Sequence, residues 1–506
     1  MLRLQQLNKK LVIVCVVAVL VTIFHIVSPA IRINRCGIVT DLYIFVESMD
    51  SALEGSLFEN SFHYTQFNPD SLVGPRHSLT LFASHFSPVL FLLFPFYALF
   101  PYALTLFVIQ AVAIGSGVVA VFLIARTILK NDLYGLLSAL IYAVYPSVVA
   151  SSSYFVPEIM AVGFFLWALF FWIRRTYPPA VLFLLLTLAT KELMALLVFS
   201  FGIFVLVCDR KYILGPLIMA GSLIYLFASL AWIIPAFAGE NYIFFGHYKH
   251  FGNSPQEAVQ TVIRQPRVLL EFIFSNSTLK YLLRILRPVC FLPVLGIKVM
   301  IANIPIFFQN ALVATPNVFT PIRDITMHWS APLVPFTMVA VVDGVRFLER
   351  HIRKLFVIVI LTAAIVLSGY YSYRFLRNML WQNPVAQSAV DMFYEEVPEG
   401  VKVSTNVPFL GWTRERFDYE LNLYFPQDIE WADYVFIWLS TYQRSVNLEE
   451  KGETRGRMLD PNIVTREYYE MIAGNSENEL VAEINDPENK QKFVIYRLAD
   501  DPLIRQ

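Results

Sequence analysis

The chain has 506 residues, of which 57% are hydrophobic and only 15% are charged. Soluble domains usually carry nearer to a quarter charged residues, so this composition excludes an ordinary soluble protein and predicts a polytopic membrane protein. The formal net charge is zero, which gives no support for a nucleic-acid partner, and the four cysteines show no spacing typical of a metal site or a disulfide framework.

The first apolar segment, residues 11–29, follows a basic start and has a long apolar core. It lacks the small-residue cleavage site of a signal peptide, so we expect a retained anchor with the N-terminus in the cytoplasm. A long outer loop is expected at about residues 30–85. Residues 88–100 are apolar but short and broken by prolines, so we expect them to lie at the interface or to re-enter the membrane.

The later apolar runs are expected to be helices, because in hydrocarbon the backbone must pair its own polar groups. Residues 178–207 begin and end beside basic residues, so both ends are placed inside. Two short helices, with Lys191 and Glu192 at the outer turn between them, satisfy this constraint. We expect about eleven transmembrane helices, at residues 11–29, 103–126, 133–150, 157–173, twice within 178–207, and at 212–235, 279–296, 297–313, 331–347 and 355–373.

The composition changes near residue 381, where charges become frequent and apolar runs shorten. We therefore expect residues 1–380 to form the transmembrane domain, with a second long outer loop at about 236–278. Residues 381–506 are expected to form a small soluble α/β domain on the extracytoplasmic side. Its predicted strands lie at residues 401–404, 434–438 and 492–496.

This threading collects the unusual polar residues on the outer side of the membrane. Ionisable groups near hydrocarbon are costly unless they pair or line a polar cavity. We therefore predict a polar cavity at the outer leaflet, whose candidate residues are Asp41, Glu47, His85, Glu158, Lys191, Glu192 and His328.

Each candidate also has a purely structural explanation. Asp41 suits the N-cap of a helix, and Glu158, directly after Pro157, suits the first turn of one. Lys191 and Glu192 can simply solvate a turn. The two histidines can be ordinary interfacial residues.

Arg284 and Arg287 stand three residues apart, on one face of a predicted helix. The guanidinium fork suits phosphate oxygens, so the two arginines can clamp a lipid phosphate, and snorkelling to the head groups is the alternative. The sequence has no phosphate-binding loop, no HExxH motif and no dinucleotide fingerprint. No nucleotide is therefore expected as a ligand, which argues against ATP-driven transport.

Several of these residues stand in strings that resemble one family, the predicted membrane proteins of domain of unknown function 2079. The resemblance covers roughly residues 35–350, and the C-terminal tail is also similar. In the third string the family often has a histidine where this chain has Val156, so a role for that histidine does not carry over. The strings are DLYIF at 41–45, HFSP at 85–88, FVPE at 155–158, KE at 191–192 and HWSAP at 328–332.

The family is similar in turn to the C-type (GT-C) membrane glycosyltransferases, which use sugars carried on polyprenyl phosphates. That resemblance implies an α-helical polytopic fold, a polyprenyl-phosphate sugar among the membrane lipids as partner, and a catalytic acidic residue in the first outer loop. Asp41 takes that place, as the base for an acceptor hydroxyl, with Glu158 or Glu47 second.

The leaving group of such a donor is a phosphate, which positive side chains stabilise best in a dry site. Lys191, Arg284 and Arg287 are the candidates for this role. The histidines, His85 and His328, are expected to orient substrate or to bind a divalent ion together with the carboxylates. No cofactor is expected to be required.

Two other functions fit the sequence less well. A transporter or lipid flippase usually needs ionisable groups at mid-membrane and paired halves, whereas the polar residues here lie on one side. A non-enzymatic membrane scaffold would tolerate changes to all of the candidate residues.

Overall fold

The computed structural model describes residues 2–34, 41–60, 79–238, 248, 250–252, 255–313, 321–379, 384–407, 420–422, 432–440, 469–486 and 491–499. The chain forms two compact units. The helical unit comprises Met1–Ala30 and Phe82–Leu380, and the second unit comprises Ile31–Leu81 and Trp381–Gln506.

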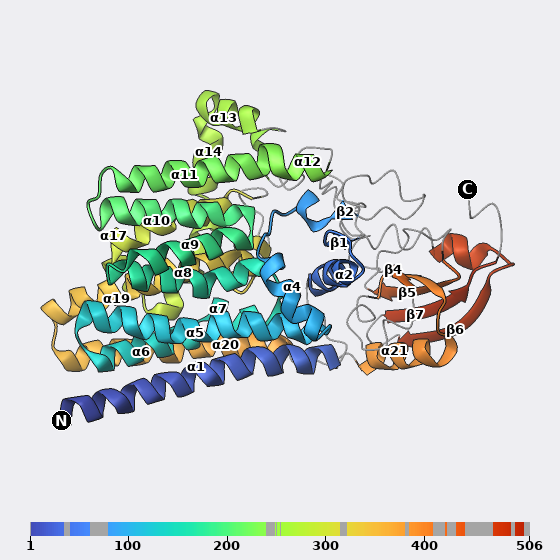
Figure 1. The fold of residues 1–506 in the computed structure, drawn as a ribbon, viewed down its shortest axis with the longest axis horizontal. Helices are drawn as coiled ribbons and strands as arrows, with labels where there is room; N and C mark the ends of the chain where they lie inside the picture. The colour runs from blue at the N-terminus through green and yellow to red at the C-terminus, as the bar shows by residue number, and fades with distance from the viewer. Residues whose placement is uncertain are drawn as a thin grey trace. The chain divides into compact units, whose positions relative to one another are not determined.

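The long apolar helices, among them α5, α8, α10 and α11, run side by side through the helical unit (Figure 1). In chain order, the helices that lie in this unit are α1 (Leu2–Asn34), α4 (Leu90–Leu99), α5 (Ala103–Leu129), α6 (Asp132–Ala143), α7 (Pro146–Ala150), α8 (Pro157–Ile173), α9 (Tyr177–Thr190), α10 (Ala195–Val207), α11 (Leu214–Ala228), α12 (Ile234–Ala238), α13 (Pro255–Arg264), α14 (Pro266–Ile273), α15 (Asn276–Leu286), α16 (Leu292–Leu295), α17 (Ile297–Met300), α18 (Ile304–Ala311), α19 (Val334–His351) and α20 (Lys354–Met379).

Short 3₁₀ turns and one π-helical turn connect several of these helices. The 3₁₀ turns are η2 (Leu81–Ala83), η3 (Ser151–Ser153), η4 (Glu192–Met194), η7 (Arg287–Val289), η8 (Ile301–Asn303), η9 (Pro321–Arg323) and η10 (His328–Leu333), and the π turn is η5 (Ser229–Ile233).

Within the described residues, five helical segments are long and apolar enough to cross a membrane. The bent pair Asp132–Ala143 and Pro146–Ser153 makes a sixth if it counts as one span. The polytopic membrane class is thus confirmed, while the count of eleven is not. The five segments are Lys9–Ile33, Ala103–Leu129, Leu214–Ala238, His328–His351 and Lys354–Arg377.

The predicted break within residues 178–207 is confirmed. Helix α9 ends at Thr190, Lys191 is extended, and η4 leads into α10. Ionisable side chains inside an apolar helix are costly, so the chain turns where Lys191 and Glu192 stand. Helix α8 packs between α5 and α9, and Gly163 permits the close approach to α5, since a Cβ there would collide with the backbone of Ala113.

The predicted hairpin of two continuous helices, at 279–296 and 297–313, is wrong. The chain instead breaks into the short pieces α15, η7, α16, α17, η8 and α18. Cys290 and Phe291 take left-handed φ angles of 51° and 56°, which helices do not tolerate. Prolines close to these breaks remove backbone donors, so a continuous spanning helix does not form here. The predicted outer loop at 236–278 lies partly outside the described residues, and it contains α13 and α14.

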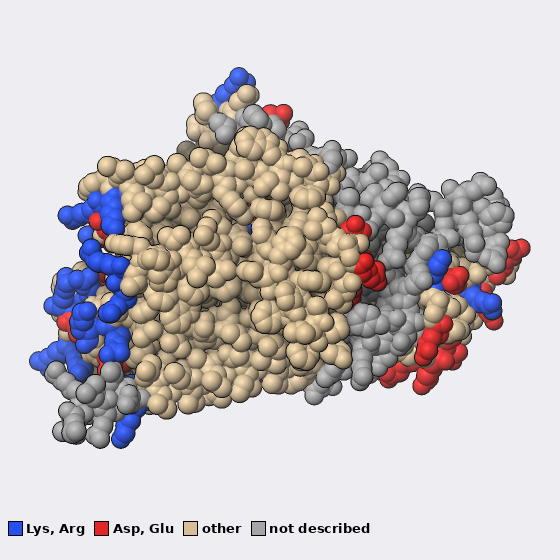
Figure 2. All heavy atoms as spheres, in the orientation of Figure 1, with Lys and Arg blue, Asp and Glu red and all other residues tan. Residues whose placement is uncertain are grey.

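Lysine and arginine gather at one end of the helical unit (Figure 2). This basic end is where α5, α8, α10 and α19 finish and where α6, α9, α11 and α20 begin. The enrichment is the pattern that the positive-inside rule associates with the cytoplasm. Its residues are Arg126, Lys130, Arg174, Arg175, Arg210, Lys211, Arg346, Arg350, Arg353 and Lys354.

The second unit begins with α2 (Leu42–Leu53) and a short antiparallel pair, β1 (Glu59–Asn60) and β2 (Leu79–Thr80). Its C-terminal part is a five-stranded mixed sheet in the order β4-β3-β5-β7-β6. Strands β3 and β5 run parallel, and β5, β7 and β6 are antiparallel neighbours. The helix and strands are α21 (Pro384–Glu396), β3 (Lys402–Thr405), β4 (Glu420–Asn422), β5 (Tyr434–Ser440), β6 (Glu479–Asp486) and β7 (Gln491–Arg497).

The three predicted strands are confirmed as β3, β5 and β7. Alternate residues of the central strands point to opposite faces, as a strand requires. Phe436 of β5 stacks on Phe393 of α21, with ring centroids 5.3 Å apart. On the other face, Val435 and Ile437 pack with Ile472. The sheet therefore has a core on each side.

Candidate functional site

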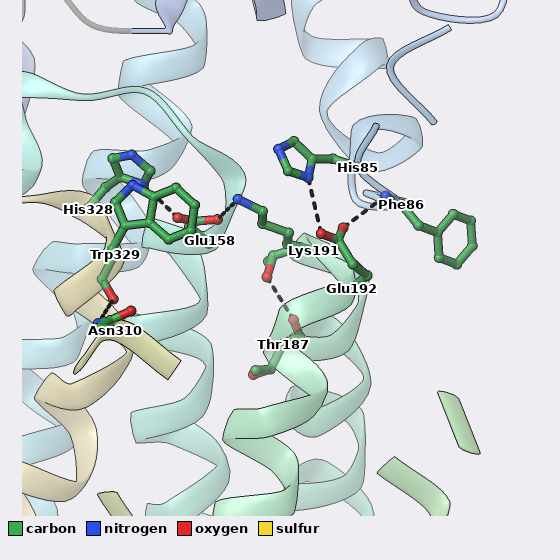
Figure 3. A network of polar contacts seen from close by, with 10 residues as sticks. His85, Phe86, Glu158, Thr187, Lys191, Glu192, Asn310, His328 and Trp329 are labelled. Carbon is green, nitrogen blue, oxygen red and sulfur yellow. Dashed lines mark hydrogen bonds and ion pairs between the residues drawn. The ribbon is translucent and has the colours of Figure 1, made fainter. Parts of the chain in front are cut away.

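Five of the predicted site residues meet in one buried network of the helical unit (Figure 3). They come from four separate segments of the chain. The residues of this network are His85, Glu158, Lys191, Glu192 and His328.

Glu158 lies in the first turn of α8, where Pro157 fits the first helical position. Its side chain is only 3% exposed. One carboxylate oxygen lies 2.6 Å from His328 Nδ1, and the other lies 2.6 Å from Lys191 Nζ. The helix N-terminus and both partners stabilise the ionised carboxylate.

Lys191 occupies the extended residue between α9 and η4, with its side chain 7% exposed. Its ammonium lies 5.1 Å from the centre of the Trp329 ring as well as beside Glu158. A buried ammonium needs such partners, because desolvation of an unpaired charge costs several kcal/mol. Lys191 therefore holds α8, α9 and the start of η10 together through a single side chain.

Glu192, at the start of η4, is completely buried. One oxygen lies 3.1 Å from His85 Nδ1, and the other accepts a hydrogen bond of 3.0 Å from the backbone N–H of Phe86. Lys191 thus contacts the pair formed by Glu158 and His328, whereas its neighbour Glu192 forms a second pair with His85.

His85 lies between η2 and α4 and is the most exposed network residue, at 16%. Burial lowers the pKa of His85, and the nearby Lys191 ammonium lowers it further, whereas the carboxylates of Glu192 and Glu158 raise it. The net direction is downward, so the imidazole of His85 is neutral near pH 7.

Trp329 is held in place by polar groups of neighbouring helices. Its backbone carbonyl accepts a hydrogen bond of 2.8 Å from Asn310 of α18. Asn310 also donates to the Tyr281 hydroxyl, at 2.9 Å, and that hydroxyl bonds Ser330 at 2.9 Å. This set of bonds joins α15, α18 and η10 and fixes the ring that faces Lys191.

Asn310 and Tyr281 were not among the site residues predicted from the sequence. The signal was present: Asn310 is a polar residue within an apolar run, and intramembrane polar residues usually have a partner or a function. Tyr281 carried no comparable signal, because a tyrosine near a predicted helix end is common.

The two arginines of the predicted phosphate clamp lie in different environments. Arg284 of α15 forms a 2.9 Å ion pair with Asp324, in which both side chains are about one-third exposed. Arg287 begins η7 and its side chain is exposed. A phosphate clamp would have to compete with Asp324 for Arg284.

Asp41 and Glu47 belong to the second unit, on or beside α2. Asp41 occupies the N-cap position, but its side chain makes no capping hydrogen bond, and its φ is 63°. The simple capping explanation for Asp41 is therefore wrong. A left-handed φ at a residue other than glycine stores strain, and such strain is often found at functional sites.

The network can perform two kinds of chemistry. Lys191 provides a positive charge in a desolvated site, which suits an anionic group. The imidazoles can accept or exchange protons. Among the described residues, no group of three or more histidine, cysteine or acidic side chains could hold a metal ion.

A sequence model of the family described as predicted membrane protein (DUF2079) matches residues 40–444. No curated protein matches the sequence significantly. Two similar solved structures are those of ArnT from Cupriavidus metallidurans, bound to undecaprenyl phosphate and in the apo state. Both are 12% identical with a TM-score of 0.48, and cover 97% and 96% of this chain and 98% of theirs. A TM-score below 0.5 at this identity does not establish a shared fold.

Proposed function

This chain belongs to the family of predicted membrane proteins DUF2079, and we propose that it transfers a sugar from a polyprenyl-phosphate carrier to an acceptor. The observation that carries the proposal is the buried network, in which a lysine, two histidines and two carboxylates converge. Replacing buried ion pairs by apolar residues is often neutral or stabilising, so a contribution to stability does not by itself account for such a network. The resemblance to GT-C enzymes suggests the use.

The reaction assigns one task to each kind of side chain. The acceptor hydroxyl loses its proton to a base, its oxygen bonds to the anomeric carbon, and the bond from that carbon to the phosphate oxygen breaks. The phosphate leaves with the electron pair, and Lys191 stabilises the negative charge that develops. Asp41 is the proposed base, in line with the family resemblance.

The lengths of α8 and α9 support a site below the membrane surface. The two helices have 17 and 14 residues. At 1.5 Å per residue they span about 26 and 21 Å, less than the roughly 30 Å of a hydrocarbon core. If the basic end lies at the cytoplasmic boundary, the network lies several ångströms inside the outer one. A polyprenyl chain could then stay in the bilayer while its phosphate reaches Lys191.

The test is a transfer assay with purified protein in lipid, radiolabelled polyprenyl-phosphate sugars, and Asp41→Asn beside the wild type. We expect release or transfer of sugar by the wild type and its loss in Asp41→Asn with unchanged thermal stability. No transfer from any donor by a stable protein would contradict the proposal. Movement of labelled lipid across vesicles without transfer would instead support a flippase.

A further inference from the structure

Three helices finish at the basic end with a basic residue in the left-handed conformation. The residues are Lys130 after α5, Arg175 after α8 and Arg210 after α10, with φ angles of 53°, 60° and 55°. Glycine is the residue usually found in this conformation at a helix end, because a side chain is strained there. The helix dipole also favours a cation, but an unstrained one in the last turn would serve equally. The strained positions therefore indicate a further use for these charges.

Two of these turns, the one between α8 and α9 and the one between α10 and α11, are tied to each other by side-chain contacts. The indole N–H of Trp172 donates a hydrogen bond of 2.6 Å to the Asp209 carboxylate. The Lys211 ammonium lies 3.3 Å from the Tyr177 hydroxyl and 4.6 Å from the centre of the Trp172 ring. These paired turns therefore form one surface, within which Lys211 and Asp209 are already engaged.

The left-handed arginines of the paired turns are not engaged in the same way. Arg175 and Arg210 are exposed, and neither guanidinium forms an ion pair or a hydrogen bond with another residue that the structure describes. At the same end, by contrast, Arg126 is paired with Asp132. A guanidinium presents a planar fork of donors that matches phosphate oxygens. Two such groups on one surface offer a site for an anionic group.

The start of α11 places large apolar side chains directly after these charges. Tyr212 is 70% exposed and Ile213 is 79% exposed, and both follow Arg210 closely in the chain. They adjoin the candidate membrane span Leu214–Ala238, most of which is not buried inside the protein. A soluble anion gains nothing from such neighbours. A phospholipid has its phosphate at the level of basic residues and its acyl chains against apolar ones, so the surface fits an anionic phospholipid.

We propose that the paired turns bind an anionic phospholipid, with Arg175 and Arg210 donating hydrogen bonds to its phosphate. Its acyl chains lie against Tyr212 and Ile213. The positive-inside rule requires only that basic residues be present in the loops of one side. It explains neither the left-handed arginines nor the contacts between the two turns. The site lies at the other end of α8 from Glu158, so it is separate from the network and does not rest on the proposed function.

The test is native mass spectrometry of the full-length protein in a neutral detergent, with phosphatidylglycerol or phosphatidylcholine of the same acyl chains. We expect the wild type to bind phosphatidylglycerol more tightly. Each basic residue near an anionic lipid surface contributes about fivefold in affinity, so Arg175→Gln with Arg210→Gln should bind this lipid about 25-fold more weakly. Binding of phosphatidylcholine should not change. Equal binding of the two lipids by the wild type would overturn the proposal.

The charge-matched control is Arg267→Gln with Lys280→Gln, which removes two exposed basic residues from α14 and α15. It should keep the preference for phosphatidylglycerol. An equal loss in the control would assign the preference to net charge and would overturn the site. Inorganic phosphate, compared with chloride at equal ionic strength, should not displace the lipid. Displacement by inorganic phosphate would show a site for a free anion instead.

The backbone strain provides an independent measurement. Arg175→Gly with Arg210→Gly should lose the lipid preference as the glutamine variant does. In detergent with phosphatidylcholine it should melt about 2–4 °C above the glutamine variant, because glycine releases the strain. A lower melting temperature would contradict the strain from which the use of these charges is inferred. If the glutamine variant fails to fold, the glycine variant gives the same binding test.

Discussion

The two ends of the helical unit both carry charges, but they use them differently. At the basic end, Arg126 and Asp132 form an ion pair in which the side chains are 36% and 28% exposed. In the network, the Glu158–Lys191 pair is 3% and 7% exposed. Solvent screens the first pair and leaves it worth little, whereas the second is strongly coupled and costly to break. Burial, and not the number of charges, distinguishes the network from the basic end.

The largest expected effect is on stability, from Glu158→Ala. This change leaves Lys191 buried without its carboxylate, and we expect a loss of about 3–5 kcal/mol of unfolding free energy. The matched control is Asp132→Ala at the basic end, with an expected loss of about 0–1 kcal/mol. Denaturation in detergent measures both. Equal losses would show that the network is no more strongly coupled than the basic end.

The network and the basic end can also be compared by their effect on activity, because each contains a lysine that lies over a tryptophan ring. Lys191 lies over Trp329, and Lys211 at the basic end lies 4.6 Å from the Trp172 ring centre. We expect Lys191→Gln to lower kcat about 10²–10³-fold, because it removes a charge that stabilises the leaving phosphate. Lys211→Gln should leave kcat unchanged. The transfer assay measures both, and similar rates in the two variants would exclude the assigned role of Lys191.

A smaller effect is expected where a hydroxyl supports the network indirectly. Tyr281→Phe removes the hydroxyl that bonds Asn310 and Ser330, and we expect a loss of about 1–3 kcal/mol in stability and a lower transfer rate. The control is Tyr142→Phe, which removes a buried hydroxyl bonded to the Ile114 carbonyl. It should cost similar stability without changing transfer. Loss of transfer in both variants would point to general loosening of the helices.

The smallest expected effect is a dependence of stability on pH at His85. Burial and Lys191 lower its pKa in the folded protein, so below about pH 6.5 the unfolded chain binds a proton that the folded chain does not. Stability should therefore fall as the pH drops from 7 towards 5. Melting curves of the wild type and His85→Gln measure this, and the variant should show the weaker dependence. An identical slope in both proteins would assign the effect to other groups.

Part of the fold followed from local sequence patterns. Continuous apolar runs identify spanning helices because the bilayer imposes both their length and their internal hydrogen bonding. Short runs rich in β-branched and aromatic residues identified β3, β5 and β7. The short helices between residues 279 and 313 could not be predicted from such patterns. They end at prolines and left-handed residues, whose effect depends on the surrounding packing. Apolar content alone could not distinguish one spanning helix from several short ones.

The sequence by itself determined the membrane class, the break at Lys191 and the residue types of the site, because hydrophobicity and charge act locally along the chain. The pairing was decided only by tertiary structure. Glu158 meets His328 across 170 residues, and His85 meets Glu192 across 107. Such contacts depend on how helices pack, and side-chain spacing in the sequence does not encode them. The adjacent residues Lys191 and Glu192 turn to different partners because the chain is extended at Lys191 and begins a tight turn at Glu192.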